Sequence, residues 1–476
     1  MLFWPFLTSI KLHPFKKEHR MTGLSHPICA HGANISNVFP RNIASPPPIA
    51  VAGQGCYLYD EHGKKYFDGS GGAAVSCLGH GDPEIINALK TQAETLAFAH
   101  TGFFTSSAAE QLASLLSAHA PAGLERVYFV SGGSEAMEAA IKLARQFHVE
   151  HGQPQRRHLI ARRQSYHGNT LGALAAGGNQ WRRAQFEPIL APASHIAPCY
   201  EYAEKRPSET PIQYAQRTAQ ELEDEILRLG PDTVMAFIAE PVVGATMGAV
   251  PAVEGYFKLI REICDRYGVL LIFDEVMCGM GRTGHLFACE ADGVTPDILC
   301  IAKGLGAGYQ PIGAMLCHKN IYAVLEQGSK LFQHGHTYNA HPMACAAGLA
   351  VLNAILDRDL LVNVQRSSEL LFSDLRARFA QHPFIGDIRG RGLFIGLEIV
   401  EDKGLKKPFD PKRNIAAQLK TDAFQNGLIC YPMRGTRDGE FGDHLLLAPP
   451  FIMEDSNITE LADRVEIAVL KISASD

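Results

Sequence analysis

The strongest constraint on the fold is an alternation of short apolar runs with helical patterns in the middle of the chain. Five runs have the length of strands and no polar alternation: 126–131, 158–162, 234–240, 269–275 and 297–303. Amphipathic patterns typical of helices separate them, such as residues 134–147 and 254–268. Strands buried on both faces that alternate with helices predict an α/β fold, with a mostly parallel sheet covered by helices on both sides.

The rest of the chain predicts a smaller α+β domain. Residues 55–69 have the pattern of two strands around a His-Gly turn, which indicates a hairpin. Beyond residue 340, two helical patterns precede short apolar runs at 384–400 and 427–433. We therefore expect four parts in order: an N-terminal extension that is a candidate for disorder (1–34), a segment joining the small domain (35–75), a large α/β domain (76–340) and a small α+β domain (341–476).

Composition excludes several classes of function. The chain has 476 residues and a net charge of −6, so it lacks the basic excess of a nucleic-acid-binding protein. Its eleven cysteines are scattered without a CxxC pair, which is typical of reduced thiols in a cytoplasmic protein and not of a zinc site or disulfide framework. No apolar segment is long enough to span a membrane. We expect a cytoplasmic protein without a metal, a membrane or a nucleic-acid partner.

The first twenty residues leave three readings open. Their apolar run precedes the basic cluster, the reverse of a secretory signal, and Met21 follows directly. The segment is an incidental extension before a start at Met21, a tail that covers the subunit surface, or a targeting sequence.

Polar groups follow four of the predicted strands at their carboxyl ends. Gly132, Gly133 and Ser134 follow the first, whereas Glu240, Asp274 and Lys303 stand at the ends of three others. In open parallel sheets, ligands bind beyond the carboxyl ends of the strands. The sequence therefore predicts that a glycine turn, two carboxylates and a lysine converge on one rim.

The glycine turn, SGGSEA at residues 131–136, suits a phosphate. Glycines between a strand and a helix let backbone N–H groups close on an anion at the positive helix terminus. The alternative is an ordinary helix start with Ser134 as the N-cap. This turn contains neither a Walker motif nor the dinucleotide-binding GxGxxG pattern.

Lys303 and Asp274 together indicate a particular cofactor. An amine desolvated at the end of an apolar strand has a lowered pKa and can form a Schiff base with an aldehyde, although a lysine there can also simply extend to water. Asp274 ends a buried strand, where a carboxylate needs a cation. A phosphate cradle, a lysine and a buried acid describe a site for pyridoxal 5′-phosphate, whose protonated ring nitrogen is that cation. Glu275 points to the opposite face of the strand, so we expect a structural role for it.

From about residue 35 to the C-terminus, the chain resembles the class III (ω-amino-acid) aminotransferases. The most specific motifs are DEVMCGMGRTG (274–284) and IAKGLGAGYQPIGA (301–314). The resemblance implies fold type I, pyridoxal 5′-phosphate as cofactor, and a homodimer with shared active sites, with a tetramer as the alternative.

The resemblance also implies roles for individual residues. Lys303 would hold the cofactor as a Schiff base and then move a proton, and Asp274 would pair with the ring nitrogen. The other implied cofactor contacts are Val276 against the ring, Tyr166 stacked on its other face, and Gly133 and Ser134 around the phosphate. Thr337 would reach the phosphate of the neighbouring subunit.

Substrate-binding residues are less sharply implied. Glu240 resembles a glutamate near the substrate carboxylate. Arg389 matches an arginine that binds a carboxylate in several relatives, and Arg434 or Arg437 lies in a stretch that resembles a mobile-arginine loop. Arginine suits this role because its planar fork binds both carboxylate oxygens.

The expected reaction is amino transfer from an amine or amino acid to a keto acid, pyruvate or 2-oxoglutarate, by a ping-pong mechanism through Lys303. The same scaffold in relatives also supports aminomutases, racemases and a decarboxylating transaminase. A non-catalytic α/β protein that binds another phosphate ligand is the remaining alternative, but it leaves Lys303 and Asp274 unexplained as a pair.

Overall fold

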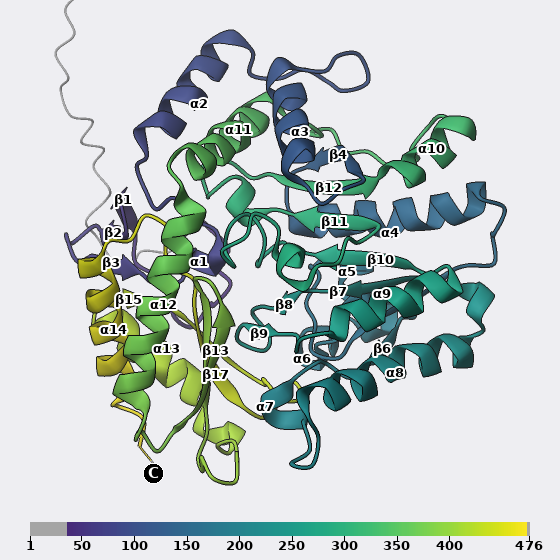
Figure 1. The fold of residues 1–476 in the computed structure, drawn as a ribbon. Coiled ribbons are helices and arrows are strands. Elements are labelled where there is room, and N and C mark those ends of the chain that lie inside the picture. Colours follow the sequence, from purple (N-terminus) through teal and green to yellow (C-terminus); the bar gives the residue numbers. More distant parts are fainter. Residues whose placement is uncertain (1–35, 474–476) are drawn as a thin grey trace, which may run out of the picture. The chain divides into compact units, whose positions relative to one another are not determined.

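The computed structural model describes residues 36–473, so the predictions for residues 1–34 and for Met21 lie outside the described residues. The chain divides into two units, Met1–Pro48 and Ile49–Asp476. Residues 36–48 of the first unit form no helix or strand. The second unit carries every helix and strand of the described chain (Figure 1).

A seven-stranded sheet organises the second unit, in the order β4-β12-β11-β10-β7-β5-β6. Its strands are β4 (Leu124–Val130), β5 (His158–Arg162), β6 (Ser194–Ile196), β7 (Val234–Ala239), β10 (Leu270–Asp274), β11 (Ile298–Ile301) and β12 (Gly313–His318). Only β12 runs antiparallel to its neighbours. The predicted α/β fold with a mostly parallel sheet is therefore confirmed, and all five predicted strands are present.

Helices cover both faces of this sheet, as Figure 1 shows for α4 and α9. Leu270 and Ile272 of β10 pack in one cluster with helices α4 and α10, whereas Leu271 and Phe273 pack in another with α8 and α9. This alternation places Asp274, the next residue in phase with Ile272, on the α4 side. The helices around the sheet are α4 (Gly133–Glu150), α5 (Leu171–Ala176), α8 (Pro211–Leu229), α9 (Tyr256–Tyr267), α10 (Lys319–Gln327) and α11 (Pro342–Asp357).

Three smaller sheets complete the fold. Strands β1 (Ala50–Gln54), β2 (Tyr57–Asp60), β3 (Lys65–Asp68) and β15 (Leu428–Ile429) form one sheet. The second consists of β13 (Ile385–Arg391), β14 (Phe394–Ile399), β17 (Asp443–Leu447) and β16 (Tyr431–Arg434), and the third of β8 (Val242–Val243) and β9 (Val250–Pro251). The predicted hairpin is β2–β3, and β3 pairs with β15, so segments from near both ends of the chain share a sheet. The division into four parts stays a prediction.

The remaining helices include three that surround the smaller sheets and several short ones. They are α1 (Gly71–Ala74), α2 (Pro83–Thr95), α3 (Ser107–His119), α6 (Gln180–Arg183), α7 (Glu201–Glu204), α12 (Leu360–Phe379), α13 (Ile415–Gln425) and α14 (Asp455–Val469).

Local sequence explains the boundaries of helices such as α2 and α9. The Asp82 side chain accepts a hydrogen bond from the Glu84 N–H at the start of α2, where Pro83 occupies the first helical position. Glycines 255 and 268, both with positive φ, flank α9.

The burial of the thiols agrees with the prediction of reduced cysteines without a disulfide framework. All ten cysteines in the described part of the chain are buried and unpaired. None of the helices from residue 36 to residue 473 is long and apolar enough to cross a membrane.

Candidate active site

The carboxyl ends of β4, β7, β10 and β11 meet at one edge of the large sheet. Asp274 is the last residue of β10 and lies opposite Cys300 of β11, and Lys303 follows two residues after β11 ends. Glu240 follows β7 directly, and Gly133 begins α4 shortly after β4. The structure thus brings the four predicted groups to the same edge, as parallel strands require.

Asp274 is buried and both of its carboxylate oxygens have partners. Oδ1 accepts a hydrogen bond from the Val276 backbone N–H at 3.0 Å. Oδ2 lies 2.8 Å from His167 Nδ1, which donates because an ionised carboxylate only accepts. The His167 side chain is itself buried, and its Nε2 has no hydrogen-bond partner among the described residues. Asp274 is therefore held in one orientation by groups that favour its negative charge.

Lys303 is suited to act as a nucleophilic amine. It begins a short 3₁₀ helix, η4 (Lys303–Leu305), with a φ of 46°, a left-handed conformation that is costly for a residue with a side chain. Burial lowers the pKa of Lys303 to about 8, although the negative charges of Asp274 and Glu240 oppose this shift. A substantial neutral fraction of the amine thus exists near pH 8.

The glycine turn forms an open cradle at the start of α4. Gly132 is the N-cap, with no side-chain cap, so the alternative reading of Ser134 as the N-cap is wrong. A Cβ added to Gly132 would meet only open space, whereas one on Gly133 would lie 2.7 Å from Val276 Cγ1. Ser134 Oγ accepts a hydrogen bond from the Asn169 N–H at 3.0 Å. The first N–H groups of α4 have no partner within the helix, so they suit an anion.

Glu240 organises the backbone around the site. Its Oε1 accepts a hydrogen bond from the Tyr166 N–H at 3.1 Å, and its Oε2 accepts one from the Gly244 N–H at 2.9 Å. Burial raises the pKa of Glu240, and the neighbouring His167 opposes that shift. Both oxygens are thus occupied by backbone donors, which places Tyr166 relative to β7.

Glu275 has the structural surroundings that its position predicts. Its Oε2 accepts a hydrogen bond from the Ala288 N–H at 2.6 Å, and its Oε1 accepts one from the Cys289 N–H at 2.9 Å. Burial raises the pKa of Glu275 to about 7. These contacts fix the start of the 3₁₀ helix η3 (Ala288–Asp292) and lie away from the Asp274 oxygens.

Arg389 lies in an internal ion pair. Its Nη2 donates to Glu398 Oε2 and to the Met247 carbonyl, each at 2.6 Å, and its Nε donates to the Gly248 carbonyl at 3.0 Å. Nη1 lies 3.3 Å from Asp387 Oδ2. Four of the five guanidinium N–H groups therefore have internal acceptors. The substrate role of Arg389 stays a prediction that these contacts do not favour.

The two other predicted arginines differ in exposure. Arg434 ends β16 and is exposed, opposite Asp443 of β17. Arg437 is partly buried, donates to the Lys406 carbonyl at 3.1 Å and has its Nε 3.5 Å from Glu398 Oε1. In this arrangement Arg434 has the freer side chain of the two.

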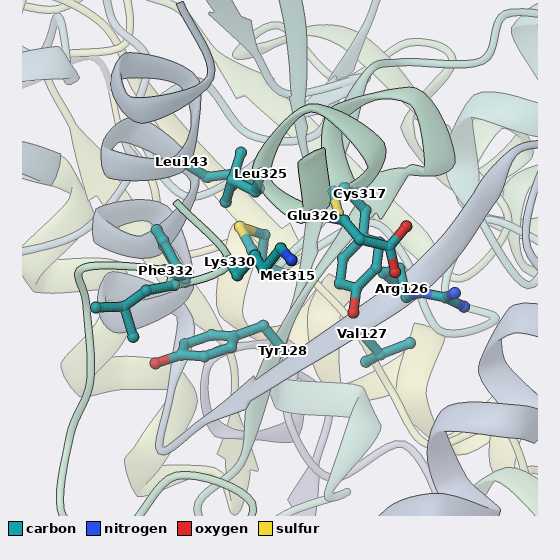
Figure 2. Close-up of a pocket in the computed structure, with 12 residues that line it drawn as sticks. Arg126, Val127, Tyr128, Leu143, Met315, Cys317, Leu325, Glu326, Lys330 and Phe332 are labelled. Atoms are coloured by element: carbon teal, nitrogen blue, oxygen red, sulfur yellow. The ribbon is translucent and has the colours of Figure 1, made fainter. Parts of the chain in front are cut away.

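Thr337 lies at the surface of the chain. It is exposed and lines a broad hollow of about 1170 Å³ together with residues from α3, β4 and the segment 331–340. A second hollow of about 520 Å³ adjoins it, lined by apolar side chains that include Tyr128, Met315 and Phe332 (Figure 2). Of the predicted site residues, only Thr337 is among the described residues that line the first hollow.

Sequence reasoning missed two residues at this edge. His167 pairs with Asp274, and the Arg182 guanidinium lies 4.5 Å from the centroid of the Tyr166 ring. His167 stands directly after Tyr166, in the stretch SYHGN at residues 165–169, so a search for a partner of the buried aspartate could have considered it. Nothing in the local sequence around Arg182 distinguishes it from Arg183, which is buried against backbone carbonyls.

These groups fit pyridoxal 5′-phosphate. Open space beside Gly132 at a helix N-terminus suits the phosphate, and the Asp274–His167 pair suits a protonated ring nitrogen. The lowered pKa of Lys303 suits the amine that holds the aldehyde. Together they account for a buried carboxylate and a lysine of lowered pKa at the same sheet edge.

Comparisons with known proteins identify the family of this chain. The model of the family described as aminotransferase class III matches residues 39–469. An uncharacterised aminotransferase of Schizosaccharomyces pombe is 46% identical over 433 residues, which cover 90% of this chain and 94% of that protein. A chloroplastic γ-aminobutyrate transaminase of Solanum lycopersicum is 35% identical over 423 residues, 87% of this chain and 79% of that protein.

Solved structures give the same result. The ω-transaminase of Pseudomonas jessenii, in complex with PMP, matches with a TM-score of 0.86 at 30% identity, over 91% of this chain and 95% of that one. The likeness extends over almost the whole chain in both sequence and structure. The chain therefore belongs to the class III aminotransferases, and it is a pyridoxal-phosphate-dependent enzyme of fold type I that transfers amino groups.

Proposed function

We propose that this enzyme moves an amino group from an amine or amino acid to a keto acid, pyruvate or 2-oxoglutarate, in two half-reactions of a ping-pong scheme. One observation carries the proposal. Lys303, with a pKa lowered to about 8, lies at the same sheet edge as the buried Asp274, and the negative charge of Asp274 acts on that pKa. The similar γ-aminobutyrate transaminase makes ω-amino acids the first donors to test.

The proposed mechanism assigns each residue one task. When bound, pyridoxal phosphate supplies an electron sink and a temporary carrier for the amino nitrogen. Lys303 would hold the cofactor and, once a substrate amine takes its place, would accept and return the proton at the substrate carbon. With a pKa of about 8, its amine has access to both protonation states near neutral pH.

Asp274 would stabilise the protonated ring nitrogen, and His167 would orient that carboxylate by donating from Nδ1. Tyr166 and Val276 would contact the two faces of the ring. Gly133 and Ser134 would contribute backbone N–H groups to the phosphate. These roles follow the family resemblance.

We also propose a homodimer in which Thr337 contacts the phosphate held by the other subunit. Apolar side chains are exposed around the two hollows near Thr337: Phe103 is 82% exposed, Phe104 69%, Leu331 62% and Tyr338 59%. An exposed apolar surface of this kind is unusual on a monomer and is typical of an interface between subunits. Figure 2 shows Tyr128 and Phe332 among the side chains that line the second hollow.

The reaction is tested by its half-reactions. Holoenzyme is mixed with single donors, among them ω-amino acids, α-amino acids and primary amines, and the absorbance change from the aldehyde to the amine form of the cofactor is recorded. Pyruvate or 2-oxoglutarate should then reverse the change. Absence of any such interconversion across the panel would contradict amino transfer by a ping-pong scheme.

The shared site is tested by hybrid dimers. Lys303→Ala and Thr337→Glu homodimers should each be nearly inactive, the second because a carboxylate would face the phosphate. A hybrid of the two variants would contain one site with both changes and one site with neither. Recovery of about half of the wild-type activity per dimer is expected, and a hybrid as inactive as its parents would place Thr337 in its own subunit's site.

A further inference from the structure

We propose that Arg182 binds a carboxylate of the substrate, so that substrates of this enzyme bear a carboxylate placed to reach α6. The proposal rests on the function proposed above and names one of its specificity-determining residues. Three observations carry it: the position of the side chain, its unpaired guanidinium and the engagement of competing arginines.

The position of Arg182 is fixed by a buried network. Asn179 caps α6 by accepting a hydrogen bond from the Arg182 N–H at 3.1 Å. Its Nδ2 donates to Gln164 Oε1 at 2.7 Å, and Gln164 Nε2 donates to the Gly435 carbonyl at 2.8 Å. Both amide side chains are buried. Short α6 is therefore anchored to the segment that carries Tyr166 and His167.

The guanidinium of Arg182 faces the reactive groups. It lies 4.5 Å from the centroid of the Tyr166 ring, and its positive charge contributes to lowering the pKa of Lys303. The Arg182 guanidinium repels the protonated amine of Lys303, which costs Coulomb energy. An anion bound between them during part of the catalytic cycle would offset that repulsion. A bound carboxylate would remove this cost.

The Arg182 side chain has a hydrogen-bond donor without a described acceptor. Its Nε is buried and has no hydrogen-bond partner among residues 36–473. No described carboxylate lies within ion-pair distance of its guanidinium, which lies 4.5 Å from the Tyr166 ring centroid and 5.8 Å from that of Trp181. A planar guanidinium with an unpartnered buried N–H is suited to binding a carboxylate.

The other arginines near the site are occupied or exposed. Arg389 is paired with Glu398, Arg183 donates to three backbone carbonyls and to Glu187, and Arg437 contacts Glu398. Arg434 is exposed at the end of β16. Of these arginines, Arg182 alone combines a buried unpaired N–H with an electrostatic effect on Lys303.

A purely structural role for Arg182 predicts a different result. If the guanidinium serves only to hold the Tyr166 ring, its removal should weaken every substrate alike, because the ring contacts the cofactor and not a substrate carboxylate. The test therefore compares ligands with and without a carboxylate.

Three variants are compared as holoenzymes: Arg182→Gln, Arg182→Lys, and Arg228→Gln as the control. The control removes an equally charged side chain that is exposed and paired only with Glu225. Kinetics are measured with pyruvate, with 2-oxoglutarate and with a primary amine that has no carboxylate. Calorimetry measures binding of butyrate and of butan-1-ol, which do not react.

Loss of a charge-assisted bidentate contact should lower kcat/KM for the keto acids about 10- to 100-fold in Arg182→Gln and raise the Kd of butyrate to a similar extent. The primary amine and butan-1-ol should change by less than about threefold. Arg182→Lys should recover part of the loss, and the control should behave as wild type. An equal loss for all ligands, or no loss for the carboxylates, would overturn the proposal.

Failure of the proposed function gives a separate signature. In that case the wild-type enzyme would show no conversion with any donor or keto acid. Binding of butyrate would still depend on Arg182 if the carboxylate site is real.

Discussion

His167 Nδ1 lies 2.8 Å from Asp274 Oδ2, and both side chains are buried at the carboxyl edge of the large sheet. The contact joins residues that are 107 positions apart in the chain. Because one Asp274 oxygen is held by His167 and the other by the Val276 N–H, the carboxylate has little freedom to turn. A fixed negative charge at this edge is what a protonated cofactor ring requires, and it stabilises charge without reorganisation during the reaction.

Asp274→Asn should lower kcat about 100- to 1000-fold while the protein stays folded. The amide keeps the size of the side chain but removes the negative charge that we propose pairs with the ring nitrogen. Single-turnover absorbance changes of the cofactor measure the effect, and circular dichroism checks the fold. A variant with more than a tenth of the wild-type rate would show that this charge is dispensable.

Glu275→Ala, in contrast to Asp274→Asn, should lower the stability of the fold and leave the turnover number nearly unchanged. It leaves the N–H groups of Ala288 and Cys289 buried without acceptors, which should lower the free energy of unfolding by about 2 to 5 kcal/mol. The turnover number of the folded fraction should change little, because Glu275 faces away from the Asp274 oxygens. Urea denaturation and active-site titration separate the two effects, and a stable but inactive variant would refute the structural role.

The pH dependence of cofactor capture should reflect the lowered pKa of Lys303. Only the neutral amine attacks an aldehyde, so the rate constant for binding pyridoxal phosphate to cofactor-free enzyme should rise with pH and level off above about pH 8. An ordinary lysine would continue to gain rate up to about pH 10.4. Stopped-flow absorbance between pH 6 and 10 measures the midpoint. A rate that still climbs at pH 10 would contradict the lowered pKa.

Arg389→Met should destabilise the protein more than it affects substrate binding. The change leaves Glu398 as a buried carboxylate without its main partner, at a cost of about 3 to 5 kcal/mol. Replacing Glu398 by Met in the same chain should restore most of that loss, since apolar pairs can substitute for buried ion pairs. A large rise in KM for keto acids with unchanged stability would instead support Arg389 as the carboxylate clamp.

Much of the fold was accessible from sequence because its core strands are buried on both faces. The runs that end in Glu240, Asp274 and Lys303 are apolar over their whole length, and parallel pairing then forces their ends to one edge. Two strands of the large sheet escaped prediction. β6 has only three residues, and β12 follows a glycine-rich loop and pairs antiparallel between β4 and β11, which local periodicity cannot reveal.

The site was predictable where chemistry is local and unpredictable where it depends on distant contacts. Lys303 and Asp274 are marked by their places at strand ends. By contrast, the pairing of Arg389 with Glu398 arises across the β13–β14 hairpin, and Arg182 is distinguished from Arg183 only by the contacts that each guanidinium makes in the folded chain. Sequence alone could name arginines but not say which of them has free N–H groups.

The most direct test of the account is to identify the amine that holds the cofactor. Purified holoenzyme is reduced with borohydride, digested, and analysed by mass spectrometry alongside Lys303→Ala. The account predicts a pyridoxyl modification on the peptide that contains Lys303 and none in the variant. A modification on another lysine, or a colourless protein that borohydride leaves unmodified, would contradict the central role of Lys303.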